Sequence, residues 1–197
     1  PDCYLIDDAE DIAWLADAED TQSLGEGMTF RLTTNIDMGH KPGQKSMKLP
    51  AGSIFDGSNL TIKGIKMMVG LFGDKATNLT VRNLIIDDAV ISSNTDANRG
   101  VLANTVCGSG CFTNVLVANS SVSTANGAAG GMIGYVSRIS KSDRSEILDI
   151  VFDNCHVINT SIESEGHEGY FIGMFRGYDN NERLTFKSNC SVIPISG

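Results

Sequence analysis

The chain has 197 residues, of which 41% are apolar and 20% charged, and its 24 acidic residues outnumber its 15 lysines and arginines to give a formal net charge of −9. This length allows one domain with one substantial core. The negative charge disfavours nucleic acid as a partner, and no apolar run approaches the ~20 residues of a membrane-spanning helix.

The first predicted element is a helix over residues 7–20, within "IDDAEDIAWLADAED". Asp7 followed by Glu10 resembles a capping box in which Asp replaces Ser or Thr. Ile12 and Leu15 then give the helix an apolar side. We expect this helix to cover the end of the strands that follow, because a stack of repeats exposes an open edge unless something covers it.

Strand-like segments follow this helix along the chain. "TFRLTTNIDM" (29–38) alternates polar and apolar residues, which indicates a first strand. "FDGSNLTIKGIKM" (55–67) reads as a second, looser repeat in which Gly57 turns the chain. The residues expected to point inward are Phe30, Leu32, Ile36, Leu60, Ile62 and Ile65.

Three further segments share one pattern: "NLIIDDAVI" (83–91), "NVLVANSSV" (114–122) and "DIVFDNCHV" (149–157). Their sixth places, with a weaker fourth copy, are 31, 35 and 35 residues apart and hold Asp88, Asn119, Asn154 and Asn189. Self-similarity at this period predicts a solenoid, and the period is too short for a four-stranded propeller blade. The fourth copy matches Leu184 and Phe186 only if Ser188 is an extra residue.

Stacked repeats would place equivalent residues about 4.8 Å apart. The inner columns are expected to be Ala89, Ser120, Cys155 and Cys190, and two residues later Ile91, Val122, Val157 and Val192. The outward column between them is Val90, Ser121, His156 and Ser191. The aligned Asp and Asn residues are interpreted as a stack that caps turns rather than as a binding site, because Asn tolerates the left-handed conformation.

A second repeated unit precedes these strands: "GLFG" (70–73), "GVLA" (100–103), "GMIG" (131–134) and "YFIG" (170–173). The last place admits alanine, so it is expected to require small size rather than a positive φ. In the fourth copy Gly169 is expected to take over the turn. We interpret the tetrad as another wall of each coil and "SRISKSDRSE" (137–146) as an insertion.

These elements predict an all-β, right-handed parallel β-helix with an N-terminal capping helix, as a single domain over 1–197 whose coils occupy 29–197. The pieces "AEDIAWLA" (9–16), "TFRLTTNIDM", "FDGSNLTIKGI", "GLFG" and the "NLIIDDAVI" strands, in this order, resemble the GLUG-motif repeat proteins of bacterial surfaces, notably of Bacteroides-like organisms. The resemblance implies the right-handed β-helix and an adhesin-like surface module without catalytic residues. We expect a segment of a longer protein, since the repeat is still running at "SVIPISG" and Pro1 stands where an initiator Met would be.

No catalytic residue and no cofactor is predicted. Asp87–Asp88 and Asp149–Asp153 are the nearest carboxylate pairs, but they fall at repeat positions, and the basic residues look scattered rather than gathered in a groove. Catalysis on this fold, as a polysaccharide lyase or glycoside hydrolase, remains the alternative function, and a structural spacer is a third.

No metal site is predicted either. "NTDANRG" (94–100) alternates Asn94, Asp96 and Asn98 like a calcium loop, but Gly100 comes one place late and Thr105 stands where the bidentate Glu belongs. An ordinary polar loop is favoured, calcium stays open, and "YDNNE" (178–182) is a weaker candidate. Zinc is disfavoured because the histidines show no ligand spacing with the cysteines. These residues are His40, His156, His167, Cys107 and Cys111.

Other candidate sites stay open. The five cysteines leave at least one unpaired, and Cys107 and Cys111 either form a disulfide or remain free thiols. The N-x-S/T sites follow from an Asn-rich repeat and need no glycan; they begin at Asn59, Asn78, Asn119, Asn159 and Asn189. Exposed aromatics for sugar stacking would be Tyr135, Tyr170 and Tyr178.

The function we expect is a non-catalytic, extracellular module of the bacterial cell surface, lipid-anchored through a part outside this chain. It would bind glycans or host and microbial proteins, or present a surface toward them. The loops on its binding side would be 92–99, 124–129, 137–146 and 162–168.

Overall fold

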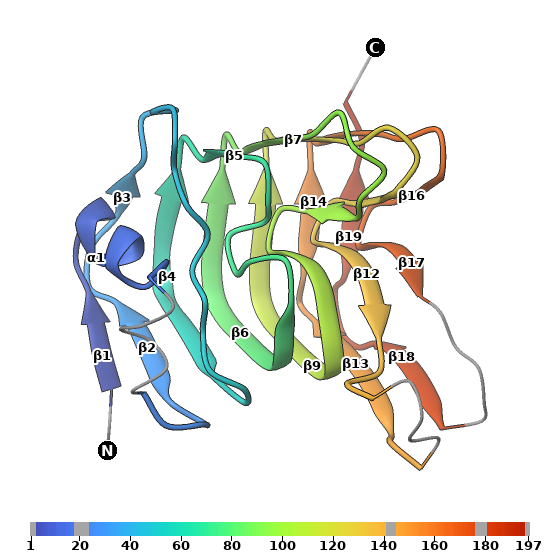
Figure 1. Cartoon of the computed structure of the whole chain (residues 1–197), viewed down its shortest axis with the longest axis horizontal. Helices are drawn as coiled ribbons and strands as arrows, with labels where there is room; N and C mark the ends of the chain where they lie inside the picture. Colours follow the sequence, from blue (N-terminus) through green and yellow to red (C-terminus); the bar gives the residue numbers. More distant parts are fainter. Residues whose placement is uncertain (1–2, 18–23, 141–144, 176–180, 196–197) are drawn as a thin grey trace.

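The computed structural model describes residues 3–17, 24–140, 145–175 and 181–195, and over these residues the chain is all-β apart from one short helix (Figure 1). Every strand pairing is parallel, and most partners are 24 to 40 residues apart in the sequence. The chain therefore returns repeatedly to lie beside its own previous pass.

The main sheet has twelve strands and follows the order β1-β2-β4-β6-β9-β12-β17 along its central path. Figure 1 shows its long strands side by side in sequence order. The strands of this path are β1 (Cys3–Ile6), β2 (Thr29–Leu32), β4 (Ile54–Lys63), β6 (Ala76–Asp87), β9 (Ala103–Ala118), β12 (Ile133–Ser137) and β17 (Ile172–Phe175). Off the path lie β3 (Ile36–Asp37), β13 (Leu148–Asp153), β14 (His156–Ile158), β18 (Glu182–Phe186) and β19 (Ser191–Ile193).

Two smaller parallel sheets come from the segments between the long strands. The four-stranded sheet contains β5 (Lys66–Met67), β7 (Val90–Ser92), β10 (Ser121–Ser123) and β15 (Ser161–Glu163), in this spatial order. The three-stranded sheet contains β8 (Arg99–Gly100), β11 (Ala128–Gly130) and β16 (His167–Gly169). One pass of the chain thus contributes to all three sheets in turn.

A column of aromatic and apolar side chains runs through the core from one pass to the next. The strand register places each member beside the one before it: Tyr4, Phe30, Phe55, Val81, Phe112, Phe152 and Phe186. The ring centroids of Phe112 and Phe152 are 5.1 Å apart, and those of Phe152 and Phe186 are 5.3 Å apart, both stacked. The predicted inward positions of the first two repeats are buried, except that Leu60 is half-buried.

The helix α1 (Ala9–Trp14) lies at the N-terminal end of the main sheet (Figure 1) and places Ile12 and Leu15 in the core. It is shorter than the predicted 7–20, and 18–20 fall outside the described residues. Asp8, not Asp7, is the N-cap: its Oδ1 accepts hydrogen bonds from the backbone N–H groups of Glu10 (2.7 Å) and Asp11 (3.0 Å). The cap therefore lies one residue later than predicted, and Asp11 Oδ2 accepts from the N–H of Asp7 (2.8 Å) rather than from that of the N-cap, so the reciprocal bond of a capping box is not formed among these residues.

The predicted alignment of the repeats is right for one pair and wrong for the next. Ile91 pairs with Val122, as expected, but Val122 then pairs with Ile162. Val157 lies in the main sheet between Val117 and Val192, so the expected column through Ile91, Val122 and Val157 does not exist. The prediction aligned the segment 149–157 with 114–122, whereas the structure aligns it with 109–117, five residues earlier.

The cause of this slip is a pair of asparagines (or Asp) five residues apart in each pass. These pairs are Asn83 with Asp88, Asn114 with Asn119, and Asn154 with Asn159, and all six residues have a positive φ between 48° and 55°. A five-residue shift therefore still lays one left-handed corner residue on another. The insertion at 137–146 hides the shift, because the pairing offset changes from 30 residues at Ser137 to 40 at Ile150.

The corner residues form two hydrogen-bonded ladders instead of one. In the first, Asn114 donates from Nδ2 to Asn83 Oδ1 (3.0 Å), and Asn154 donates to Asn114 Oδ1 (2.8 Å). In the second, Asn119 donates to Asp87 Oδ1 (2.8 Å), and Asn159 donates to Asn119 Oδ1 (3.2 Å). The turn-capping interpretation holds in kind, but Asn119 and Asn154 belong to different ladders.

The fourth strand copy lies where the sequence predicted. Leu184 and Phe186 pair with Ile150 and Phe152 at an offset of 34 residues, and Ser191 pairs with His156 at an offset of 35. One extra residue therefore lies between them, as expected near Ser188. The backbone N–H of Ser191 donates to Cys155 O (3.1 Å), so Cys155 and Cys190 belong to adjacent repeats as predicted.

The tetrads also stack, with the predicted offset in the first and last steps and a shift of one residue in the middle step. Gly100 pairs with Gly130 rather than Gly131, and Gly130 pairs with Gly169, which takes over the glycine position in the last copy. At the last tetrad place, a Cβ on Gly134 would lie 2.6 Å from the backbone N of Arg99, so small size is required there. The exception is Gly73, whose φ of 87° requires left-handed freedom.

The turn predicted at Gly57 is made by its neighbours. Ser58 and Asn59 have positive φ values of 54° and 61°, and the N–H of Ser58 donates to Asp56 Oδ1 (3.0 Å). A Cβ on Gly57 would collide with the backbone of Asn83 in the next strand. Gly57 is therefore needed for close approach and not for its own φ.

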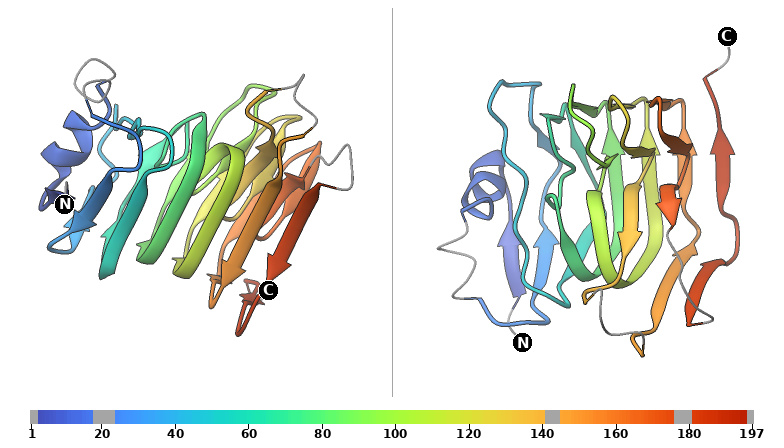
Figure 2. Two further views of the ribbon diagram at one scale, coloured as in Figure 1. Left: turned by 90° about the horizontal axis from the view of Figure 1, so that it is seen from below. Right: turned by 45° about the vertical axis from the view of Figure 1, so that its right-hand side comes forward.

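The two ends of the stack differ. The helix lies at the end that begins with β1, whereas the strands β18 and β19 lie at the opposite end, as Figures 1 and 2 show. The last strands leave large apolar side chains exposed, namely Leu184, Phe186, Ile193 and Ile195.

Candidate functional site

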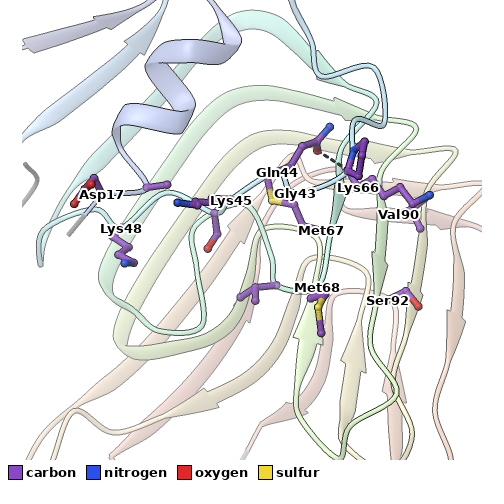
Figure 3. A pocket seen from close by; sticks show the side chains of 14 residues that line it. Asp17, Gly43, Gln44, Lys45, Lys48, Lys66, Met67, Met68, Val90 and Ser92 are labelled. Carbon is purple, nitrogen blue, oxygen red and sulfur yellow. Dashed lines mark hydrogen bonds between the residues drawn. The ribbon is translucent and has the colours of Figure 1, made fainter.

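A hollow of about 1010 Å³ lies beside β5, the first strand of the four-stranded sheet. Its walls come from the segment between β3 and β4, from the residues around β5, and from β7. Figure 3 shows Lys45 and Lys48 on the side of α1, Val90 and Ser92 on the opposite side, and Met68 between them. We call this the lysine hollow, after Lys45, Lys48 and Lys66 in its lining.

Backbone hydrogen bonds hold the lysine-bearing segment in place. The N–H of Met47 donates to Leu71 O (2.8 Å), and the N–H of Lys48 donates to Leu15 O (2.8 Å). Met47 is fully buried, whereas Lys45 and Lys48 on either side of it are exposed. The segment is therefore anchored to the core while its lysines face solvent.

The side chain of Gln44 occupies the free edge of β5. Its Oε1 accepts from the N–H of Lys66 (2.7 Å), and its Nε2 donates to Gly64 O (3.2 Å) and Met38 O (2.8 Å), with the first bond drawn in Figure 3. The amide side chain thus forms hydrogen bonds that a further strand would otherwise form. The backbone groups of Lys66 and Gly64 at this edge are therefore hydrogen-bonded without another strand.

The three lysines of the hollow have no carboxylate partner among the described residues. Some basic side chains elsewhere are paired, namely Lys63 with Asp37 at 3.0 Å, Arg82 with Asp56 at 3.0 Å and Arg138 with Glu182 at 3.1 Å, whereas the exposed Lys75 and Lys187 also lack a carboxylate partner within the described ranges. The Lys63 hydrogen bond is the main reason that the pKa of Asp37 is lowered. The hollow thus concentrates positive charge on a chain whose net charge is −9.

This gathering corrects the expectation that the basic residues are scattered. The signal lay in "KPGQKSMK" (41–48), which carries three lysines in eight residues between two predicted strands. Lys66 comes from another part of the chain, through the pairing of β5 with β7 that sets Lys66 beside Val90. Sequence reasoning missed the site because the segment 41–48 matched no repeat.

A second hollow, about 510 Å³, lies further along the same side of the molecule. It is acidic, and Glu163, Glu165 and Glu168 line it together with Ser and Thr residues of the neighbouring passes. It is formed by three of the predicted projecting loops, 92–99, 124–129 and 162–168. Ser92 lines the first hollow and Ser93 the second, so the two adjoin.

The outward face of the four-stranded sheet joins the two hollows. Its rows follow the strand register: Lys66, Val90, Ser121 and Ser161 in one row, and Ser92, Ser123 and Glu163 in the other. Ser123 Oγ donates to Ser92 Oγ (3.0 Å). We call these outward serines the serine strip.

The candidate calcium loop uses its oxygens within the fold. Asn126 Nδ2 donates to Asp96 Oδ1 (3.1 Å), and the N–H of Ala128 donates to Asn98 Oδ1 (3.1 Å). Thr105 is buried in β9, away from the loop. These contacts tie the loop to the next pass and support the polar-loop interpretation.

Beneath that loop, Arg99 is buried and donates to Asn98 O (2.7 Å) and Thr95 Oγ1 (3.2 Å). Burial lowers the pKa of this guanidinium, and the charge of Asp74 opposes the shift. The loop therefore rests on a buried cation, which disfavours a second cation close by.

The carboxylate pairs considered for catalysis are not brought face to face. Asp87 pairs with Ala118 on one side of β9, whereas Asp153 pairs with Thr113 on the other side. The strand β9 and five positions along it separate Asp87 from Asp153, so the two carboxylate pairs lie on passes that are not adjacent. Among the described residues that line the lysine hollow, Asp17 is the one that carries a carboxylate.

The cysteines and histidines form no metal-ligating cluster among the described residues. All five cysteines are free, with Cys107 buried and Cys111 exposed. His40 Nε2 lies 2.9 Å from Asp88 O, and His156 Nδ1 lies 2.7 Å from Ser191 Oγ. Desolvation by burial raises the pKa of Cys155 to about 11, which keeps this thiol protonated.

The predicted aromatic set does not form one surface. Tyr135 is half-buried on β12, Tyr170 is exposed before β17, and Tyr178 lies outside the described residues. Within the described ranges, the cluster of three potential metal-ligating groups is Asp7, Asp8 and Asp11 at the start of α1. These carboxylates, two exposed and one half-buried, lie at the helix cap, where Asp8 and Asp11 accept backbone hydrogen bonds.

No helix among the described residues is both long and apolar enough to span a membrane.

Comparison with known proteins adds little to this geometry. No protein-family model matches the chain, and no curated protein matches it. A crystal structure from Bacteroides ovatus, named "putative immunoglobulin A1 protease", is similar with a TM-score of 0.49 and 16% sequence identity. The match covers 97% of this chain and 64% of that one, so the chain spans less than two thirds of its length.

Proposed function

We propose that the chain is a non-catalytic module of the bacterial cell surface, adhesin-like and related to the GLUG-motif repeat proteins, that binds glycans or proteins. Its three sheets would be the walls of a right-handed parallel β-helix, with α1 as the N-terminal cap. The continuous columns across successive passes support this architecture, since stacked coils bring equivalent residues together.

The observation that carries the proposal is the face of the molecule on which the two hollows adjoin. Both hollows and the serine strip lie on loops and outward positions, while the corner asparagines and apolar columns hold the stack together. Loops on a rigid scaffold are a usual place for binding residues. A spacer would need only a flat, uniform surface, so the hollows favour binding.

A glycan array probed with the whole chain, with and without added calcium, tests this function. Binding to a defined group of glycans is expected. An array that stays blank in both conditions, together with no surface protein captured by crosslinking on intact cells, would contradict it and leave the spacer. A calcium-dependent signal would bring the 94–100 loop back into consideration.

A carbohydrate-active enzyme acting on acidic sugars is the second candidate, because three lysines line the hollow beside β5. Such enzymes neutralise the sugar carboxylate with cations before a proton is abstracted. Incubating the chain with acidic polysaccharides and following chain length by size-exclusion chromatography distinguishes the two. Shortened chains would establish catalysis and contradict the non-catalytic proposal.

A further inference from the structure

We propose that the lysine hollow and the adjoining serine strip bind an acidic saccharide chain, whose sugar units carry carboxylate or sulfate groups. This inference rests on the proposed glycan-binding function and specifies its site and its class of ligand.

The charge distribution gives the first argument. Lys45, Lys48 and Lys66 line one hollow without a carboxylate partner among the described residues, in a chain that is otherwise acidic; Lys45 and Lys48 lie on the side of α1, and Lys66 lies beside Val90. Lysines placed around one hollow in this way form a local positive field that attracts anions. Each exposed ion pair contributes little alone, so the matching ligand carries several anionic groups on one chain.

The serine strip gives the second argument. Its strands are about 4.8 Å apart, and each contributes a hydroxyl that both donates and accepts hydrogen bonds. Such groups match the hydroxyls of a sugar chain, and the exposed thioether of Met68, at 63% exposure, offers an apolar contact for the C–H face of a ring. The strip leads directly away from the lysines.

The sealed edge of β5 argues against an acidic peptide as the ligand. Peptides bind sheet edges chiefly through main-chain hydrogen bonds. Gln44 already occupies the N–H of Lys66 and the carbonyl of Gly64. The hollow therefore offers side-chain ammonium, hydroxyl and thioether groups, which suit a saccharide.

The acidic hollow sets the limit of the site. Glu163, Glu165 and Glu168 repel anionic sugar units at the far end of the strip. Anionic units are held at the lysines, and neutral hydroxyls lie over Ser92 and Ser123. The saccharide chain is thus expected to bind in one direction along the sheet, with its anionic units at the lysine end.

Binding of fluorescent oligogalacturonate and of a sulfated heparin oligosaccharide to the whole chain tests the proposal, with a neutral cello-oligosaccharide as comparator. The hollow variant is Lys45→Gln with Lys48→Gln. The matched control is Lys75→Gln with Lys187→Gln, which removes the same charge from exposed lysines elsewhere. Circular dichroism checks that both variants fold.

We expect at least one acidic oligosaccharide to bind, with affinity that falls as salt rises. The hollow variant is expected to bind about tenfold more weakly or worse, and the control within about twofold of the unchanged chain. The preferred probe identifies carboxylate or sulfate as the recognised group.

Three results would overturn the inference. Equal loss in both variants would show only net-charge attraction. Binding of neutral oligosaccharides alone would place recognition elsewhere and leave the glycan-binding function intact. Equally tight binding of a polyglutamate peptide would assign the hollow to acidic protein segments. A blank result with every glycan would contradict the proposed function itself.

Discussion

At the scale of single residues, the left-handed asparagines hold neighbouring passes together. Asn114 has a φ of 54°, accepts a hydrogen bond from Asn154 and donates one to Asn83. Most residues disfavour this backbone conformation by about 1–2 kcal/mol, whereas Asn and Gly adopt it readily. The hydrogen bonds of the side chain and the left-handed backbone conformation therefore both favour asparagine at position 114.

Replacing Asn114 separates these two contributions. Asn114→Ala loses both ladder bonds and places alanine at positive φ, so the free energy of unfolding is expected to fall by about 1–3 kcal/mol. Asn114→Gly loses the same bonds without the backbone strain and is expected to lose less. Urea denaturation measures both, and a glycine variant less stable than the alanine variant would contradict the role of the conformation.

Cys155 predicts a pH dependence at the same scale. Because burial raises the pKa of its thiol to about 11, the unfolded chain loses this proton first as pH rises above the ordinary value of 9.0. Stability is complete below that value and is lost between it and about 11, by up to about 2–3 kcal/mol. Chemical denaturation across this range should show a smaller decline in Cys155→Ala. Equal slopes would rule the thiol out as the cause.

At the scale of elements, Gln44 takes the place of a strand beside β5. Gln44→Ala leaves the N–H of Lys66 and the carbonyls of Gly64 and Met38 without this partner, and should lower the free energy of unfolding by about 1–3 kcal/mol. Gln44→Glu keeps the acceptor for the N–H of Lys66, so its free energy of unfolding is expected to lie between those of the unchanged chain and Gln44→Ala. Thermal unfolding of the three proteins tests this order, and an unchanged Gln44→Ala would show that water replaces the side chain freely.

The sequence could predict the strands themselves but not all of their pairings. Alternation identified Phe30, Leu32 and Ile62 as core residues, and all three are buried. The predicted position of Val157 was wrong because each pass has two left-handed corners five residues apart, which give two alignments of similar quality. Only the hydrogen-bond register, which depends on the length of the inserted loop, decides between them.

The lysine hollow was outside the reach of sequence patterns for a related reason. Lys48 and Lys66 are 18 positions apart and belong to different passes. What joins them is the path of a segment that matches no repeat and is anchored by Met47. Composition gives the number of lysines, but only the fold shows that these lysines line one hollow.

At the scale of the whole molecule, the aromatic column predicts unequal contributions from equal side chains. Phe112 is fully buried within the stack, whereas Phe186 at its far end is 48% exposed. Phe112→Ala should destabilise the chain by about 3–5 kcal/mol, and Phe186→Ala by less than half of that. Denaturant unfolding compares them directly, and equal losses would mean that the last strands are as well packed as the middle.

The insertion at 137–146 also has a practical meaning. The offset between paired strands grows by ten residues across it, yet β9 continues unbroken beside β12 and then β13. Extra chain length is thus absorbed at a junction between two strands of the main sheet at small entropic cost. The same junction should accept a grafted epitope, and retained cooperative melting of such a chimera would make the protein a display scaffold.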